Sequence, residues 1–469
     1  MDIPAPMDIL SRISPLKKEL GFLGSFSMGF ADVGADIFLA LGLIAAYAGG
    51  AMPFAILIAA GVYVLTGLCY AELASAIPVA GGASVYGERA FGKLAGFIGG
   101  WGLMLDYTID IALFAVASAG YLSFFFPALR PMLPLASAVI IVILVVINLF
   151  GIKESSWVNS WLTIGTIALL VLLMAIGFGT RFDLETFLSG IKPIAESPGI
   201  HNFLYSVTLA MVAFIGIESI SQGAEETRNP EKTLPRAHIT AVSSVVIFAV
   251  LISIMALGIV APAVLAQRSD SPLVAVALAL PFASLLVPIV AATGFAICFV
   301  SANTGIIGVS RVTYSMSNHG LLTRRFQWVH PVFRTPWVTI LLFSAVAIIL
   351  ASFGDLFFLG ELYAFGALTA YLIACLSLIK LRFSEPNVPR PYSVPINILW
   401  KGVRIPLLAI AGVIGCAAML FLVFWLHEAG RNFALLWFLV GGVHFFFYRN
   451  YRNKKDAQDA VKGVRKVAF

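Results

Sequence analysis

Charged side chains are scarce in this chain of 469 residues. They make up 12% of it, about half of the roughly 25% typical of soluble domains. Hydrophobic residues make up 60%, and the mean hydropathy is +0.96. This composition excludes a water-soluble globular domain and predicts an all-α integral membrane protein.

Cysteine and histidine are also rare, and their positions exclude several kinds of site. The four cysteines lie within apolar runs without metal-binding spacing, which predicts small core residues. None of the six histidines lies near the centre of an apolar run, which argues against a histidine proton relay. No nucleophile–base pair or metal-ligand set stands out, so we expect a protein that is not an enzyme and holds no metal or cofactor.

Long apolar runs recur along the chain, each able to cross a hydrocarbon core about 30 Å thick. The first 20 residues carry Arg12, Lys17 and Lys18 instead of an apolar core, so they do not resemble a cleavable signal peptide. The sequence predicts twelve spans, at about 24–48, 53–79, 94–126, 135–151, 157–179, 202–223, 237–260, 284–316, 337–353, 356–380, 404–426 and 432–448.

The basic residues are distributed unevenly between the two ends of these spans. All but five of the 30 Lys and Arg residues fall on the side of the N-terminus. The exceptions are Arg130, Arg181, Lys192, Arg268 and Arg431. The positive-inside rule then places both termini, residues 1–23 and 449–469, in the cytoplasm of a plasma-membrane protein. The net charge of +6 is explained by topology, so we expect no nucleic acid partner and no obligate protein partner.

Two apolar segments carry pairs of aspartates at a spacing of four residues. Asp32 and Asp36 lie in the first segment, and Asp106 and Asp110 in the third. A carboxylate at membrane depth costs roughly 2.5–3.5 kcal/mol, and like charges four residues apart share a helix face. We expect a cation or proton to offset that cost. The alternative is that Asp32 and Asp36 cap the start of a helix, while Asp110 pairs with a hydroxyl or backbone donor.

Glycines suggest an internal symmetry. Gly29, Gly34 and Gly42 interrupt the first segment, and Gly216 and Gly223 the sixth. Transporters often place interrupted helices at corresponding positions of two inverted repeats, although glycines also serve close packing. The prediction is a transporter domain over 24–448, with repeats at about 24–179 and 202–380, broken helices 1 and 6, and two added helices over 404–448.

Three motifs carry a resemblance to a known family. Residues 214–236 read FIGIESISQGAEETRNPEKTLPR, residues 70–86 YAELASAIPVAGGASVY, and residues 310–322 SRVTYSMSNHGLL. They resemble segment 6 and its following loop, segment 2, and the end of segment 8 of the amino acid–polyamine–organocation superfamily. The resemblance implies a five-plus-five, LeuT-like inverted-repeat fold, transport by alternating access and no covalent chemistry.

The first segment departs from the pattern of amino-acid-binding members. There a glycine-rich break leaves free amides for the substrate carboxylate, whereas this chain has Asp36 at the last glycine position. An ionised Asp36 would repel a carboxylate and compete for the same amides. The segment is similar to that of a potassium–proton symporter branch, which carries aspartates near Asp32 and Asp106, but Leu39 stands where that branch has a tyrosine.

These considerations assign candidate residues to three roles. Substrate contact is expected at Asp32, Gly34, Asp36, Asp110, Ile215 and Gly216, and proton coupling or gating at Asp106, Tyr107, Phe214 and Glu218. In some proton-coupled relatives a lysine in the fifth segment takes the place of a sodium ion, whereas this chain has Thr166 at about that position. A sodium site that includes Ser301 and Thr304 is therefore an alternative. Those two small residues are equally well explained by helix packing. Glu72 is interpreted as structural.

The expected function is secondary active transport of a cationic amine, such as a polyamine, an organic amine or a basic amino acid, coupled to protons. A potassium or other inorganic cation symporter and a neutral amino acid permease are the alternatives. A channel is disfavoured because no filter-like segment is present.

Overall fold

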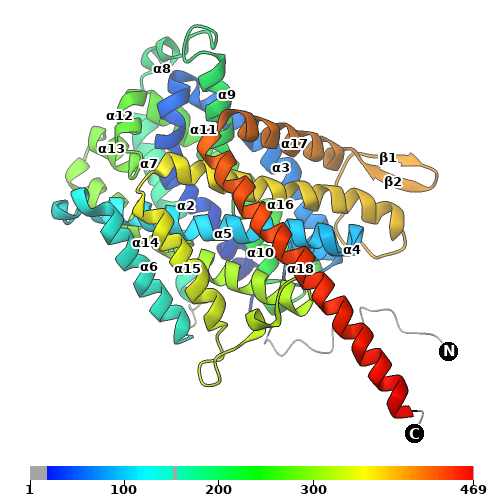
Figure 1. Ribbon diagram of the computed structural model, residues 1–469. Helices are drawn as coiled ribbons and strands as arrows, with labels where there is room; N and C mark the ends of the chain where they lie inside the picture. The colour runs from blue at the N-terminus through cyan, green and yellow to red at the C-terminus, as the bar shows by residue number, and fades with distance from the viewer. Residues whose placement is uncertain (1–17, 152–155, 468–469) are drawn as a thin grey trace.

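The structure, a computed structural model, describes residues 18–151 and 156–467, which are almost entirely helical (Figure 1). Ten apolar stretches in these residues are long enough to cross a membrane. The first, Phe22–Ala76, contains two helices, and the shorter apolar helix Trp337–Ser352 adds another. The described part of the chain therefore forms the twelve predicted membrane segments.

The first half of the chain supplies five membrane helices. They are α2 (Phe22–Ala48), α3 (Met52–Ala76), α5 (Lys93–Leu122), α6 (Leu133–Leu149) and α7 (Ser156–Thr180). Short elements join them: η1 (Gly49–Ala51), the amphipathic α4 (Ala83–Phe91) and η2 (Pro127–Met132).

The second half repeats this arrangement. Its membrane segments are the interrupted run α9 (Ile200–Leu209), η3 (Ala210–Phe214) and α10 (Glu218–Gln222), then α11 (Pro230–Leu257), α14 (Ala283–Asn318), α15 (Trp337–Ser352) and α16 (Leu356–Ser384). The connecting elements are α8 (Leu184–Gly190), η4 (Ala224–Glu226), α12 (Pro262–Gln267), α13 (Pro272–Ala279) and η5 (Arg324–Gln327). An antiparallel hairpin of β1 (Asn397–Trp400) and β2 (Val403–Pro406) precedes α17 (Leu407–Leu426) and α18 (Glu428–Val467).

Corresponding helices of the two halves pack against each other. Helix α3 packs on α11, α5 on α14 and α6 on α15, which are the second, third and fourth membrane segments of each half. Short helices follow the second segment of both halves, namely α4 in the first and α12 with α13 in the second. This pairing agrees with the expected five-plus-five fold, although the exact repeat limits stay a prediction.

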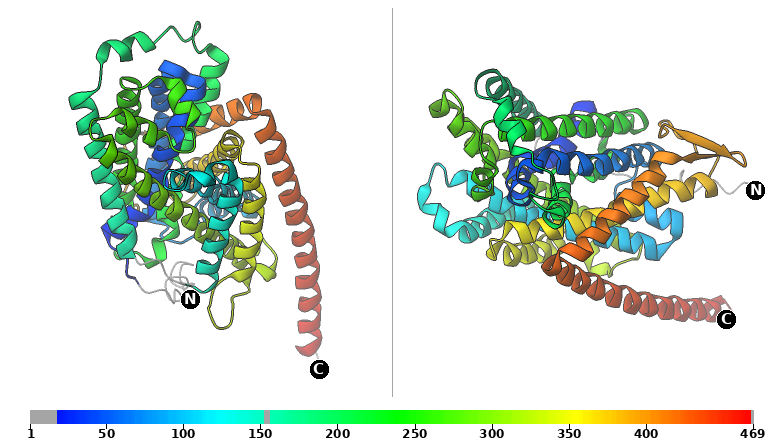
Figure 2. Two further views of the ribbon diagram at one scale, coloured as in Figure 1. Left: turned by 90° about the vertical axis from the view of Figure 1, so that its left-hand side faces the viewer. Right: turned by 90° about the horizontal axis from the view of Figure 1, so that it is seen from above.

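Helix α5 forms the centre of the bundle, where it packs on both α14 and α16 (Figure 2). Its residues 99–121 are all buried. Close approach to α14 depends on Gly305 and Gly308, because a Cβ at either position would lie 2.5 Å from an atom of Asp110 or Tyr107. The aspartates of α5 are therefore enclosed by protein instead of facing lipid.

The expected break in helix 6 is present, whereas helix 1 is not broken. Residues 215–217 separate η3 from α10, and Gly216 has a left-handed φ of +113°. By contrast, Phe22–Ala48 is one continuous α-helix, so the prediction of a broken helix 1 was wrong in this conformation. Its glycines serve close packing instead: a Cβ on Gly29 would lie 2.5 Å from Ile220, and one on Gly42 would lie 2.5 Å from Ser269.

The five exceptional cations share one face of the bundle. Arg130 lies in η2, Arg181 directly after α7, Lys192 two residues after α8, Arg268 directly after α12, and Arg431 in the first turn of α18. We call this the outer face, following the prediction from charge distribution. The opposite, inner face carries the end of α3, α4, the β1–β2 hairpin and the distal end of α18 (Figure 1).

Candidate functional site

Five acidic side chains from three membrane segments meet in the interior. Asp32 and Asp36 come from α2, Asp106 and Asp110 from α5, and Glu218 from the first position of α10. Each is at most 1% exposed. We call these five residues the carboxyl cluster.

Asp32 links α2 to the break in segment 6 and to α14. Its Oδ2 accepts a hydrogen bond of 2.5 Å from Ser219, and its Oδ1 one of 3.0 Å from Ser301. A Cβ on Gly216 would lie 2.8 Å from the Asp32 carboxyl, so only glycine fits there both by conformation and by space. The break is thus built around this carboxyl group.

Asp36 contacts the backbone of the same break. Its Oδ2 accepts a hydrogen bond from the amide of Ile215 at 3.3 Å, while its Oδ1 has no hydrogen-bond partner among the described residues. The Ile215 amide is a donor that the interruption of segment 6 leaves free of helical bonding. Asp36 therefore occupies a backbone donor of the kind that binds anionic groups.

The remaining acids are held mainly by tyrosines. Asp110 Oδ1 accepts from Tyr363 at 3.2 Å and from Ser301 at 3.5 Å, and Glu218 Oε2 accepts from Tyr371 at 3.0 Å. Asp106 lies within hydrogen-bonding reach of Glu218, a contact that requires a proton on one of the two carboxyl groups, and no other described residue donates a hydrogen bond to its carboxyl oxygens. Asp110 Oδ2 and Glu218 Oε1 are likewise unpaired.

Basic partners are not found for the carboxyl cluster. Among residues 18–151 and 156–451, no Lys, Arg or His forms an ion pair or hydrogen bond with any of the five acids. Buried charges that lack a partner of opposite charge carry a large desolvation cost. The cluster can be stable only if protons or a bound cation neutralise part of its charge.

Three further residues that the sequence predicts for gating or substrate contact are Tyr107, Phe214 and Gly34. The Tyr107 hydroxyl is 3.5 Å from Ser219 Oγ, and the Phe214 ring stacks on Tyr63 with centroids 5.2 Å apart. Gly34 packs under the ring of Phe30 within its own helix.

The three members of the possible sodium site are used differently. Ser301 bonds to two acids of the cluster, whereas Thr304 donates to Val300 of its own helix at 3.1 Å. Thr166 is fully buried, and its hydroxyl has no hydrogen-bond partner among the described residues. The sodium site stays a prediction.

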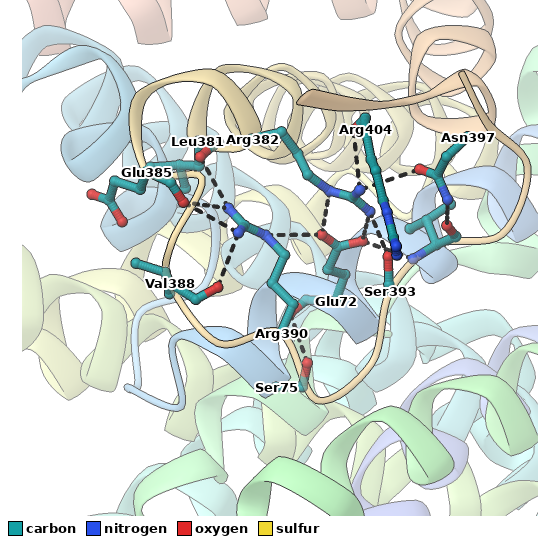
Figure 3. Close-up of polar contacts among 11 residues, drawn as sticks. Glu72, Ser75, Leu381, Arg382, Glu385, Val388, Arg390, Ser393, Asn397 and Arg404 are labelled. Atoms are coloured by element: carbon teal, nitrogen blue, oxygen red, sulfur yellow. Dashed lines mark hydrogen bonds and ion pairs between the residues drawn. The ribbon is translucent and has the colours of Figure 1, made fainter. Parts of the chain in front are cut away.

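Glu72, the other buried acid of the first half, has a different environment (Figure 3). Its carboxylate accepts from the Arg382 guanidinium at 2.5 and 2.7 Å and from the Val394 amide at 2.7 Å, and it lies 3.2 Å from Arg390. These contacts join α3 to α16 and to the segment before the hairpin. They agree with the structural interpretation of Glu72.

Sequence reasoning missed two groups of polar residues. Ser219 and Tyr363 contact the carboxyl cluster, and the spacing of eight residues between Tyr363 and Tyr371 was a usable signal because it places both on one helix face. A second buried group lies on the outer face, where Glu361 accepts from Tyr205 and from the Gly430 amide and lies 3.1 Å from His427. No local sequence motif predicts that group.

Comparison with known proteins places the chain among transporters. The family model described as "Amino acid permease" matches residues 20–443. The branched-chain amino acid permease BcaP of Bacillus subtilis is 28% identical, with 94% of both chains covered. The methylthioribose transporter of the same organism is 26% identical, over 94% of this chain and 96% of the relative. The chloroplastic cationic amino acid transporter 9 of Arabidopsis thaliana is 27% identical, over 79% of this chain and 67% of the relative. With this match over nearly its whole length, the chain belongs to the amino acid permease family, a family of multi-pass membrane transporters and not of enzymes.

Proposed function

We propose that this permease moves a cationic amine, namely a polyamine, an organic amine or a basic amino acid, by alternating access with proton coupling. The observation that carries the proposal is the carboxyl cluster, five buried acids without a basic partner among the described residues. A positively charged substrate would supply the missing counter-charge.

The polar contacts of the break favour a cation over an anion. The Ile215 amide is already bonded to Asp36, and a substrate carboxylate approaching it would meet a second carboxyl group. An ammonium group, which only donates hydrogen bonds, matches the unpaired acceptors Asp36 Oδ1 and Asp110 Oδ2. In addition, no group of three acidic, histidine or cysteine residues with metal-holding geometry occurs in the described residues, which favours an organic cation over a divalent metal.

The neighbouring acids Asp106 and Glu218 are the proposed proton carriers. Two adjacent carboxyl groups without a cationic partner titrate as a pair and share protons. Tyr371 bonds to Glu218 Oε2 and lies 3.4 Å from the Phe214 carbonyl at the end of η3, so protonation of Glu218 can be transmitted to the break. We further propose a plasma-membrane location with both termini in the cytoplasm.

A neutral amino acid permease is the second candidate, favoured by the similarity to a branched-chain amino acid permease. In that case Asp36 would be protonated throughout the cycle, and its neutral carboxyl group would no longer repel a substrate carboxylate.

The two functions are separated by uptake in proteoliposomes. We expect an inward proton gradient to drive uptake of one or more of putrescine, lysine and arginine and not of leucine, K⁺ or Na⁺. The carboxyl group of Asp36 favours putrescine, which has no carboxylate, over the two amino acids. Asp36→Asn should abolish this uptake in a folded protein, whereas Asp355→Asn, at the exposed cap of α16, should retain it because asparagine also caps helices well. Uptake of leucine alone would support the second candidate, and wild-type uptake of cations by Asp36→Asn would refute the first.

A further inference from the structure

A cavity of about 340 Å³ opens at the outer face, away from the carboxyl cluster. Its walls come from the end of α5, from η2, and from the segment joining α12 to α13; they include Ser123, Arg130, Gln267, Arg268, Ser271 and Val274. Gly120, which also lines it, lies ten residues beyond Asp110, or about 15 Å along the helix. The cavity is therefore a separate site.

The charges around the cavity are unbalanced. Arg130 Nη1 lies 3.5 Å from Asp270 Oδ2, and Asp270 is itself buried. The guanidinium of Arg268 makes no ion pair or hydrogen bond with any group in the described part of the chain. Two of the five cations predicted for the outer face thus line one cavity, and only Arg130 has a carboxylate partner among the described residues.

The chemistry of the walls indicates the ligand. A guanidinium presents a planar fork of donors that matches a carboxylate, and Gln267 adds an exposed amide donor. The volume lies at the lower end of the range for small-molecule sites, roughly 300–1,000 Å³. We propose that this cavity binds the carboxylate of a solute of amino-acid size from the outer side, with Arg268 as the main anchor and Arg130 beside it. This inference does not depend on the proposed transport of cations.

A ligand bound in the cavity would lie close to two contacts that hold α5 and the α12–α13 segment against α2 at the outer face. Tyr121 follows Gly120 in the chain, and its hydroxyl donates to the Phe38 carbonyl at 2.6 Å, two residues beyond Asp36. Ser269, next to Arg268, approaches α2 so closely that a Cβ on Gly42 would lie 2.5 Å from its Cα. A bound carboxylate would join η2 to the α12–α13 segment, which itself packs on α2.

The test is hydrogen exchange of the full chain in nanodiscs of neutral lipid, with 4-methylpentanoate as probe and isopentylamine as the analogue without a carboxylate. We expect 4-methylpentanoate, and not the amine, to slow exchange in residues 120–130 and 265–275. Arg268→Gln should weaken binding by about tenfold or more, as expected for loss of a charged hydrogen bond. Arg268→Lys should show an intermediate affinity, because lysine retains the positive charge but lacks the planar pair of donors that a guanidinium presents to a carboxylate.

Two controls separate this site from others. Arg181→Gln, on the same face but outside the cavity, should bind the probe normally. Asp36→Asn should also bind it normally, which would show that the site is not the carboxyl cluster. The proposal is overturned if no protection appears, if Arg268→Gln binds like the wild type, if the amine protects equally, or if protection appears only when anionic lipid is added in place of the probe.

Discussion

The amide of Ile215 donates its hydrogen bond to Oδ2 of Asp36 at 3.3 Å, across the break in segment 6. This contact joins the residue that replaces an expected glycine in helix 1 to the free backbone of helix 6. Under the proposed function, this contact places a carboxyl group on a backbone donor that would otherwise suit an anion.

The glycine at that break is expected to be indispensable. Gly216→Ala would place a Cβ 2.8 Å from the Asp32 carboxyl, in a residue with φ of +113°. We expect a loss of about 1–3 kcal/mol in the free energy of unfolding from backbone strain, together with loss of uptake. Thermal unfolding in detergent and uptake in proteoliposomes would measure the two effects.

A matched control is available at Gly49, which also has a positive φ, of +53°, but has open space around its Cβ position. Gly49→Ala should show backbone strain without loss of uptake. Normal uptake by Gly216→Ala would contradict the role given to the break.

Asp32 and Asp36 illustrate how far the sequence could be interpreted. Their cost in an apolar segment was evident from charge and hydropathy alone, and the motif around Gly216 located the break. Their hydrogen bonds to Ser219 and Ile215 depend on how α2 crosses α10, which no local pattern encodes. The continuity of helix 1 was missed because glycines predict a break and close packing equally well, and only the contacts of Gly29 and Gly42 distinguish the two.

Glu72 is expected to contribute strongly to stability and not to transport specificity. Glu72→Gln would leave the guanidinium of Arg382, which is 5% exposed, without its carboxylate partner. Removing one member of a buried ion pair costs about 3–5 kcal/mol. Thermal unfolding should detect this loss, while Glu385→Gln, which breaks the half-exposed pair with Arg89, should cost at most about 1 kcal/mol. Equal effects of the two variants would argue against the structural role of Glu72.

A pH-dependent contact is expected on the inner face between α4 and the end of α14. The Glu88 carboxylate, 2.6 Å from His319, raises the pKa of that histidine above its ordinary 6.5. The pair therefore stabilises the protein fully below the ordinary pKa, and the contribution disappears as the pH rises through the raised pKa. Because His319 is partly exposed, we expect at most about 1 kcal/mol.

Thermal unfolding of the wild type and of His319→Gln, compared at about pH 5 and about pH 9, would measure this contribution. The variants should differ at the lower pH and converge at the higher one. His201→Gln, exposed on the outer face, should leave the pH dependence unchanged. A constant difference between wild type and His319→Gln across this range would contradict the assignment.

The outer half of segment 6 is expected to depend on Glu361. This carboxylate receives hydrogen bonds from Tyr205 of α9 and from the Gly430 amide, and it lies beside His427, whose Nε2 is 2.5 Å from Thr208 Oγ1. These contacts fix α9, which ends directly before η3 and the break, to α16 and to the start of α18.

Glu361→Gln should therefore release α9 while leaving the carboxyl cluster intact. Glutamine keeps only one acceptor oxygen, so at least one of the buried donors around it loses its partner, at a cost of about 1–3 kcal/mol. Hydrogen exchange in residues 200–209 should accelerate by about ten- to a hundredfold relative to the wild type. Glu428→Gln, an exposed carboxylate nearby, should leave that exchange unchanged. If residues 200–209 exchange equally fast in the wild type and in Glu361→Gln, α9 is held by its apolar packing on α2 and α3, and Glu361 does not control the outer half of segment 6.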